Sequence, residues 1–149
     1  MTFQCLPFAQ LSVFQLYECM ALRQEVFVVE QNCVYQDCDG KDLKGWHLMG
    51  YNTDGKLVAY ARLLPQGTSY PDYPSIGRIV TSPSARGDGA GRALVQAAIT
   101  EMHQLFGKVP IKIGAQLYLL KFYQSFGFQP VGEEYLEDGI PHIEMILPA

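Results

Sequence analysis

Residues 79–92 read Ile-Val-Thr-Ser-Pro-Ser-Ala-Arg-Gly-Asp-Gly-Ala-Gly-Arg and contain the strongest local signals in the chain. The β-branched run over residues 75–82 predicts a buried strand, and Pro83 ends it. A helical pattern of apolar residues follows over residues 90–106, and Gly107 suits its C-terminal stop. The sequence therefore predicts a strand, a glycine-rich turn and a helix in direct succession.

This turn has the chemistry of a phosphate-binding site. Gly87, Gly89 and Gly91 leave the backbone bare, so amide groups can approach phosphate oxygens closely. The start of the helix adds a partial positive charge, and Arg86 and Arg92 can add charge-assisted hydrogen bonds. We expect the turn to hold a pyrophosphate. A merely tight connection between strand and helix remains the alternative.

Two common nucleotide-binding motifs do not fit the turn. No Gly-Lys-Ser/Thr follows the glycines, which argues against a P-loop that hydrolyses nucleotides. The spacing is Gly-x-Gly-x-Gly and lies late in the chain, whereas the dinucleotide fingerprint is Gly-x-Gly-x-x-Gly in an early βαβ unit.

The rest of the chain alternates strand and helix signals. Ser12 and Gln15 form a predicted capping box, and Asp54-Gly55 predicts a hairpin turn. A polar loop is expected over residues 32–45. The resulting order predicts a mixed α/β sheet with helices on its faces. Further strands are expected at residues 3–8, 46–52, 57–64, 111–116, 128–131 and 142–147, and further helices at residues 13–30 and 118–126.

Composition narrows the class of protein. A length of 149 residues predicts one domain over residues 1–149, and the net charge of −4 disfavours general nucleic-acid binding. The first 22 residues hold no Lys or Arg, and no apolar run approaches the length of a membrane span. We therefore expect a cytoplasmic protein that does not bind membranes and keeps its four cysteines reduced.

Neither metal nor cysteine chemistry is favoured by the pattern. Cys33, Cys38 and His47, with Asp37 and Asp39, suggest a metal site only weakly, since Cys-x4-Cys is not the spacing of a zinc-finger pair. No cysteine lies in a recognisable Cys–His context, which disfavours nucleophilic catalysis by cysteine. We expect no metal.

The stretch at residues 79–91 resembles the acetyl-CoA motif of the GCN5-related N-acetyltransferase (GNAT) superfamily, in which a strand and a proline precede Arg-x-x-Gly-x-Gly/Ala at the start of a helix. A second match follows at residues 121–128, Lys-Phe-Tyr-Gln-Ser-Phe-Gly-Phe, which is similar to the family's Phe-Tyr-x-x-x-Gly-Phe segment. Two motifs in the right order are far more specific than either alone.

Further segments resemble the ElaA-like branch of this superfamily, so that the similarity covers nearly the whole chain. They are residues 23–31, 35–37, 39–40 and 137–142. The resemblance implies the GNAT fold, an α/β (α+β) domain with a mixed central sheet of about six to seven strands flanked by about four helices. It says little about the substrate.

The resemblance also implies an acetyl-CoA-dependent N-acetyltransferase and a set of cofactor contacts. Since no cysteine suits a covalent acyl-enzyme, we expect the acetyl group to pass directly to the amine. Ile79, Val80 and Thr81 would offer backbone groups to the pantetheine arm, and Gln116 would place a polar side chain near that arm. The pyrophosphate would be held by the amides of Arg86, Gly87, Asp88, Gly89, Ala90, Gly91 and Arg92.

Tyr123 matches the family's tyrosine that resembles a general acid. Attack of an amine on the thioester expels a thiolate, and protonation of that sulfur assists its departure. The alternative is that Tyr123 only packs, since the chain has nine tyrosines and Phe122 and Phe126 lie beside it.

A base is needed if the acceptor is a lysine-like amine, because with a pKa of about 10.4 only roughly one in two thousand is neutral at pH 7. Some relatives carry a glutamate on the strand before the glycine-rich turn, but here Arg78 is the only charge on that strand. The remaining candidates for a base or for substrate binding are Glu30, Glu134, His142 and Glu144, each with a surface or ion-pairing role as the alternative.

The acceptor itself is not named by the sequence. Glu30, Asp37 and Asp39 suggest binding of a cationic acceptor, with a solvated acidic loop as the alternative. We expect a small-molecule or peptide amine as substrate, and a homodimer is compatible with exposed aromatic residues. A non-catalytic sensor or scaffold that binds acyl-CoA remains the alternative function.

Overall fold

The computed structural model describes all 149 residues and contains one seven-stranded mixed sheet. The strand order is β1-β2-β3-β4-β5-β7-β6, antiparallel throughout except for the parallel neighbours β4 and β5. The strands are β1 (Thr2–Pro7), β2 (Trp46–Tyr51), β3 (Leu57–Leu64), β4 (Ser75–Thr81), β5 (Ile111–Gln116), β6 (Gln129–Glu137) and β7 (Ile140–Leu147).

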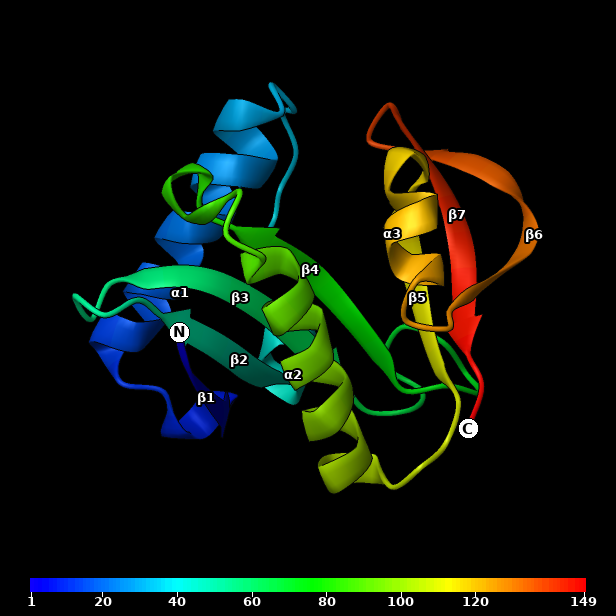
Figure 1. Ribbon diagram of the computed structural model, residues 1–149, viewed down its shortest axis with the longest axis horizontal. Helices are drawn as coiled ribbons and strands as arrows, with labels where there is room; N and C mark the ends of the chain where they lie inside the picture. The colour runs from blue at the N-terminus through cyan, green and yellow to red at the C-terminus, as the bar shows by residue number, and fades with distance from the viewer.

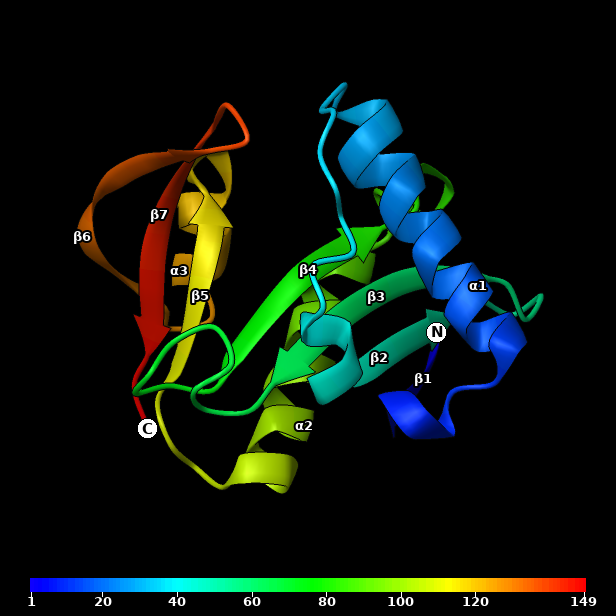
Figure 2. The ribbon, with the colours of Figure 1, turned by 180° about the vertical axis from the view of Figure 1, so that it is seen from behind.

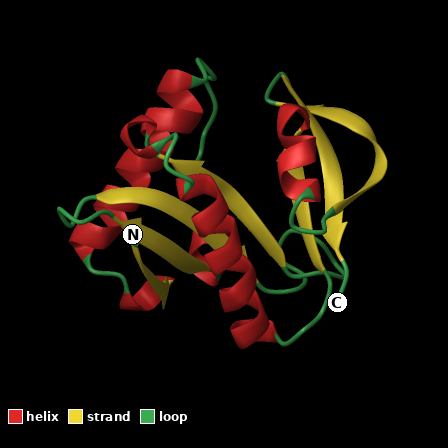
Figure 3. Cartoon of the chain, viewed as in Figure 1, coloured by secondary structure: helices red, strands yellow, loops and turns green.

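Helices cover both faces of the sheet. In Figure 1, α2 and α3 lie in front of the strands, and Figure 2 shows α1 on the opposite face. Figure 3 separates the helices from the strands by colour. The α-helices are α1 (Val13–Arg23), α2 (Ala90–Phe106) and α3 (Leu120–Gln124). A π-helical segment, η2 (Gln24–Glu30), continues α1, and 3₁₀ turns occupy η1 (Phe8–Gln10), η3 (Lys41–Lys44), η4 (Pro83–Ala85) and η5 (Leu117–Leu119).

The elements around the glycine-rich turn are those that the sequence predicts. β4, α2 and β5 match the predicted strand, helix and strand to within one residue. At α1, Ser12 accepts a hydrogen bond from the Gln15 amide at 3.0 Å and its own amide donates to Gln15 Oε1 at 2.9 Å, which confirms the capping box. The hairpin at Asp54-Gly55 joins β2 to β3, with Gly55 at φ +78°.

The C-terminal part differs in element length. The predicted helix over residues 118–126 is split, because residues 117–119 form a 3₁₀ turn and α3 ends at Gln124. β6 runs to Glu137, six residues beyond the predicted strand. Its pairing with β7 is irregular between Val131 and Tyr135, so the alternation of apolar and polar side chains that identifies a strand is lost there.

Two apolar cores lie on the two faces of the sheet, and β3 is buried along its whole length. The larger core joins α2 to the sheet and extends to Tyr123 and Phe128. The smaller core packs Cys19 and Leu22 of α1 against Met49 and Tyr60. A strand buried on both faces holds α1, which η2 continues, and α2 at fixed positions on opposite faces of the sheet.

The parallel strands β4 and β5 part from one another. They are paired only at Ser75 and Lys112, and Figures 1 and 2 show them diverging beyond that point. Beyond Ser75, therefore, the edge of β4 that faces β5 has no strand partner. An opening is thus built into the middle of the sheet.

Candidate active site

A cleft of about 1090 Å³ occupies the opening between β4 and β5. Its walls come from η2, β4, the glycine-rich turn, the start of α2, β5 and the β6–β7 hairpin. All but one of the residues expected to bind the cofactor line this cleft; the exception is Asp88, whose side chain lies outside it. Those that line it are Ile79, Val80, Thr81, Arg86, Gly87, Gly89, Ala90, Gly91, Arg92 and Gln116.

The glycine-rich turn adopts a backbone that favours glycine. Gly87 has φ +96° and Gly89, the N-cap of α2, has φ +75°. Side chains at these two positions would be strained, which explains why glycine is used there. Both expected phosphate-binding arginines already have partners: Arg86 binds Glu30, and Arg92 donates to Ser125 and stacks on Phe126 at 4.6 Å.

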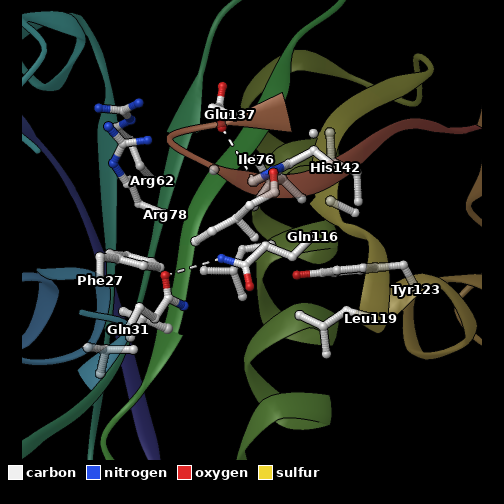
Figure 4. A pocket seen from close by; sticks show the side chains of 18 of the residues that line it. Phe27, Gln31, Arg62, Ile76, Arg78, Gln116, Leu119, Tyr123, Glu137 and His142 are labelled. Carbon is white, nitrogen blue, oxygen red and sulfur yellow. Dashed lines mark hydrogen bonds and ion pairs between the residues drawn. The ribbon is translucent and has the colours of Figure 1, made fainter. Parts of the chain in front are cut away.

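Tyr123 lies at the inner wall of the cleft with 5 % of its surface exposed. Its ring packs edge-on against Phe122 and Phe128, and its hydroxyl points into the cleft toward Gln116 (Figure 4). Burial, and secondarily the neighbouring Tyr118, raise the pKa of Tyr123 well above its ordinary value. The hydroxyl therefore keeps its proton at neutral pH.

Of the four candidates for a base, three line the cleft and Glu134 does not. Glu30 is bound by Arg86 in two hydrogen bonds of 2.7 Å, and Glu144 is paired with Lys112 at 3.1 Å. His142 is 6 % exposed and faces Glu137, so it is the one candidate whose ionic neighbour is an anion.

The end of η2 and the residues that follow it contact three other elements of the cleft. A π-helix places successive side chains differently from an α-helix, and it is often found at functional sites. Here Glu30, Gln31 and Cys33 each reach an element on the far side. Glu30 contacts Arg86 of the glycine-rich turn, and Gln31 contacts Gln116 at the end of β5. Cys33 contacts the carbonyl of Asp138 in the β6–β7 turn.

Asp37 and Asp39, which the sequence suggests either bind a cationic acceptor or form a solvated loop, are instead bound by arginines. Arg23 donates to Asp37 at 2.7 Å, Arg62 to Asp39 at 2.8 Å, and Arg78 to both. Asp42 joins the same network through Arg23 and Arg62. Three arginines thus neutralise three aspartates, and a further cation would find no free carboxylate there.

This network anchors the wall of the cleft to the sheet. Arg23 is fully buried on α1, Arg62 projects from β3, and Arg78 occupies an irregular position in β4 with φ +51°. The Nε of Arg62 is buried without a hydrogen-bond partner. The network holds residues 37–42 against β3 and β4, and so sets the position of the wall.

The ionisation of Asp39 makes the stability that this network contributes depend on pH. Burial alone would raise the pKa of Asp39, but hydrogen bonding to Arg62 and the charges of Arg62 and Arg78 outweigh burial and lower the pKa to about 2. In the unfolded chain the pKa is about 3.9, so the folded carboxylate stabilises the protein above about pH 4 and loses this contribution as the pH falls toward 2.

We therefore expect Asp39→Asn to destabilise the protein at pH 6 by on the order of 1 kcal/mol, because solvent screening at this partly exposed carboxylate reduces the effect of the pKa shift. The difference from wild type should shrink as the pH falls from about 4 to about 2, because Asp39 of the wild type is then itself protonated. Urea unfolding of both proteins at several pH values measures this difference. A difference that stays constant over this range would contradict the assignment.

Several residues of the cleft are not indicated by the sequence. The hydroxyls of Tyr70 and Tyr135 meet above Gly114 of β5, where an added Cβ would lie 2.7 Å from the Tyr135 oxygen and 3.3 Å from that of Tyr70. Arg62 and Arg78 also line the cleft (Figure 4). These side chains come from elements far apart in the sequence, and only the fold brings them together.

Two further observations concern metals and membranes. No group of three or more His, Cys, Asp or Glu side chains is arranged to hold a metal ion. None of the helices combines the length and apolar character that a membrane span requires.

Comparison with known proteins identifies the family. The model of the acetyltransferase (GNAT) domain matches residues 17–148, which is most of the chain. The chain belongs to the GNAT superfamily. Within the superfamily it is an ElaA-like protein: ElaA of Escherichia coli is 47 % identical over 144 residues, covering 95 % of this chain and 93 % of that protein. A UPF0039 protein of Synechocystis sp. is 49 % identical over 139 residues, covering 93 % and 90 %.

Solved structures agree with this placement. An acyl-CoA N-acyltransferase from Pseudomonas aeruginosa superimposes with a TM-score of 0.92 at 43 % identity over 99 % of both chains. The crystal structure of Escherichia coli ElaA gives a TM-score of 0.89 at 45 % identity over 97 % of both chains. The predicted GNAT fold is thereby confirmed, and acyl transfer is the activity that the family and these structures support.

Proposed function

We propose that this GNAT protein transfers an acetyl group from acetyl-CoA directly to a primary amine. The observation that carries the proposal is the parting of β4 from β5, which leaves the β4 edge beyond Ser75 without a strand partner. An extended amide chain can bind such an edge as an added strand does. The pantetheine arm of CoA has that character, and Ile79, Val80 and Thr81 would bind it.

The edge of β4 leads to the glycine-rich turn. Amides from Arg86 to Arg92 would bind the pyrophosphate there, since a helix start with bare glycines favours an anion. The residues fit this group, because Gly87 and Gly89 are exposed and an added Cβ at either meets nothing within 4 Å. The opening beside the turn is therefore not filled by protein.

Tyr123 would act as the general acid. Its raised pKa keeps the hydroxyl protonated, and the hydroxyl faces the cleft where the thioester of a bound cofactor would end. A proton on the leaving sulfur assists breakage of the C–S bond. Gln116, next to Tyr123 in the cleft, would contact the pantetheine arm.

Titration of the purified protein with CoA and acetyl-CoA in a calorimeter tests the proposal, together with an assay of free thiol in the presence of primary amines. We expect saturable binding and an amine-dependent release of CoA. Binding without any release of thiol would favour a non-catalytic acyl-CoA sensor, and absence of binding would refute the proposal.

The ion pair between Arg86 and Glu30 gives a more specific prediction. Pyrophosphate would compete with Glu30 for the Arg86 guanidinium, whose two bonds to Glu30 measure 2.7 Å each. Because an exposed pair contributes about 0–1 kcal/mol, Glu30→Gln should strengthen CoA binding by up to about fivefold. Calorimetry measures the change, and Glu133→Gln, an exposed change outside the cleft, is the control. Unchanged or weaker binding in Glu30→Gln would contradict the competition.

A further inference from the structure

The β6–β7 hairpin places a histidine and a carboxylate at the end of the cleft away from the glycine-rich turn. His142 is paired with Gln116 of β5 on one side and with Tyr135 of β6 on the other. Its Nε2 lies 3.4 Å from Oε2 of Glu137, and both residues line the cleft (Figure 4).

The other ring nitrogen fixes the tautomer of His142. Its Nδ1 lies 2.7 Å from the carbonyl oxygen of Ile140, and a carbonyl can only accept a hydrogen bond. Nδ1 must therefore carry a proton. In the neutral ring Nε2 then has a lone pair, and that lone pair points toward the cleft and Glu137.

In the neutral form of His142, two acceptors face each other across 3.4 Å, the Nε2 lone pair and the Glu137 carboxylate. Such a pair is satisfied by a group that donates hydrogen bonds to both and carries positive charge. A protonated primary amine has three N–H donors and one charge, and fits both requirements.

We propose that this pair is the acceptor subsite for a primary alkylammonium group, with Glu137 binding the ammonium and His142 Nε2 taking its proton. This inference rests on the proposed function. The two cleft carboxylates that the sequence also suggests as bases are each bound to a cation, Glu30 to Arg86 and Glu144 to Lys112, so their oxygens are already engaged. His142 has no such partner.

Two residues, His142 and Tyr123, exchange protons during the transfer. One ammonium proton passes to His142 Nε2, and the amine lone pair forms a C–N bond to the thioester carbonyl. The C–S bond then breaks, and the Tyr123 hydroxyl gives its proton to the sulfur. The attacking nitrogen loses a second proton, which restores Tyr123, and His142 releases its proton to water. The products are the amide, CoA thiol and one proton.

Other titratable groups share this end of the cleft. The side chain of Glu137 is 58 % exposed. Glu144 lies on the same strand as His142, two residues further on, and also lines the cleft. Apart from Glu137, the groups facing His142 are Tyr135, whose ring lies 5.7 Å away, and Glu144, which Lys112 neutralises.

Two amine substrates of different basicity distinguish a role of His142 as a base from a purely structural role. Propylamine is protonated at neutral pH and needs a base, whereas methoxyamine is unprotonated and needs none. With acetyl-CoA, we expect His142→Gln to lower kcat/KM for propylamine by about 10²–10⁴-fold and that for methoxyamine by less than about tenfold. Glu137→Gln, an exposed change that should not disturb folding, should raise KM for propylamine by roughly tenfold and leave methoxyamine unaffected.

His103→Gln and Glu134→Gln are the matched controls, because both residues lie outside the cleft. Equal losses for the two acceptors, or none, would overturn the inference. So would a wild-type protein that acetylates methoxyamine alone. Failure of wild type to bind CoA in the calorimeter would instead refute the proposed function, so the two failures are distinguishable.

The tautomer can be measured without any turnover. The chain has three histidines, so comparison of ¹⁵N spectra of wild type and His142→Gln assigns the His142 ring. We expect a protonated Nδ1 and a bare Nε2 in the neutral ring. A ring protonated at Nε2 instead would overturn the inference.

Discussion

Replacing Tyr123 by phenylalanine is expected to lower kcat by about 10²–10⁴-fold, the range that a general acid contributes. The CoA dissociation constant should stay the same, because only the hydroxyl is lost and it is needed only when the C–S bond breaks. The ring that packs against Phe122 and Phe128 remains, so the fold should be preserved. The thiol-release assay measures kcat, and calorimetry measures binding.

Tyr118→Phe is the matched control for this prediction. Tyr118 also lines the cleft, but 76 % of it is exposed and it does not match the tyrosine of the family motif. Its hydroxyl should therefore contribute little to turnover. Equal turnover of Tyr123→Phe and wild type would remove Tyr123 from the role of acid and leave it as a packing residue.

Replacing Arg23 by methionine is expected to give the largest loss of stability. Arg23 is fully buried and donates to Asp37 and Asp42 at 2.7 Å each, with a longer contact of 3.4 Å to Tyr60. Removing one partner from a buried ion pair typically costs about 3–5 kcal/mol, because the other charge stays buried without its partner. Urea unfolding followed by the fluorescence of Trp46, the single tryptophan, measures this cost.

Arg86→Met is the control, since it removes an arginine from an ion pair whose side chains are 43 % and 39 % exposed. An exposed pair contributes only about 0–1 kcal/mol, so the two variants should differ clearly in their free energies of unfolding. Similar losses in both would show that Arg62 and Arg78 compensate for Arg23 within the network.

Elements with a strong local signal could be predicted from the sequence. The β4–α2 unit is marked by a β-branched run, a proline, three glycines and an apolar helical stripe, and each of these acts within a few residues. The capping box at Ser12 is likewise local. The two family motifs then placed Tyr123 and the glycine-rich turn in one site, and both line the same cleft.

Elements without a regular local pattern were predicted less well. The irregular pairing of β6 near Gly132 breaks the alternation of side chains, and its extension to Glu137 follows from pairing with β7 rather than from its own residues. The 3₁₀ turn before α3 is equally invisible in the apolar pattern. In both places the neighbouring strand or helix determines the length of the element.

The family, the glycine-rich turn and the motif around Tyr123 could be recognised along the chain, because they depend on contiguous residues whose chemistry acts locally. Which charged side chains are available depends instead on the three-dimensional fold. Asp37 and Asp39 look free along the chain, yet the fold brings Arg23, Arg62 and Arg78 to them from three different elements. His142 and Glu137 face each other because two strands pair. Ion pairs form between side chains a few ångströms apart in space, and positions along the chain do not show which side chains are that close.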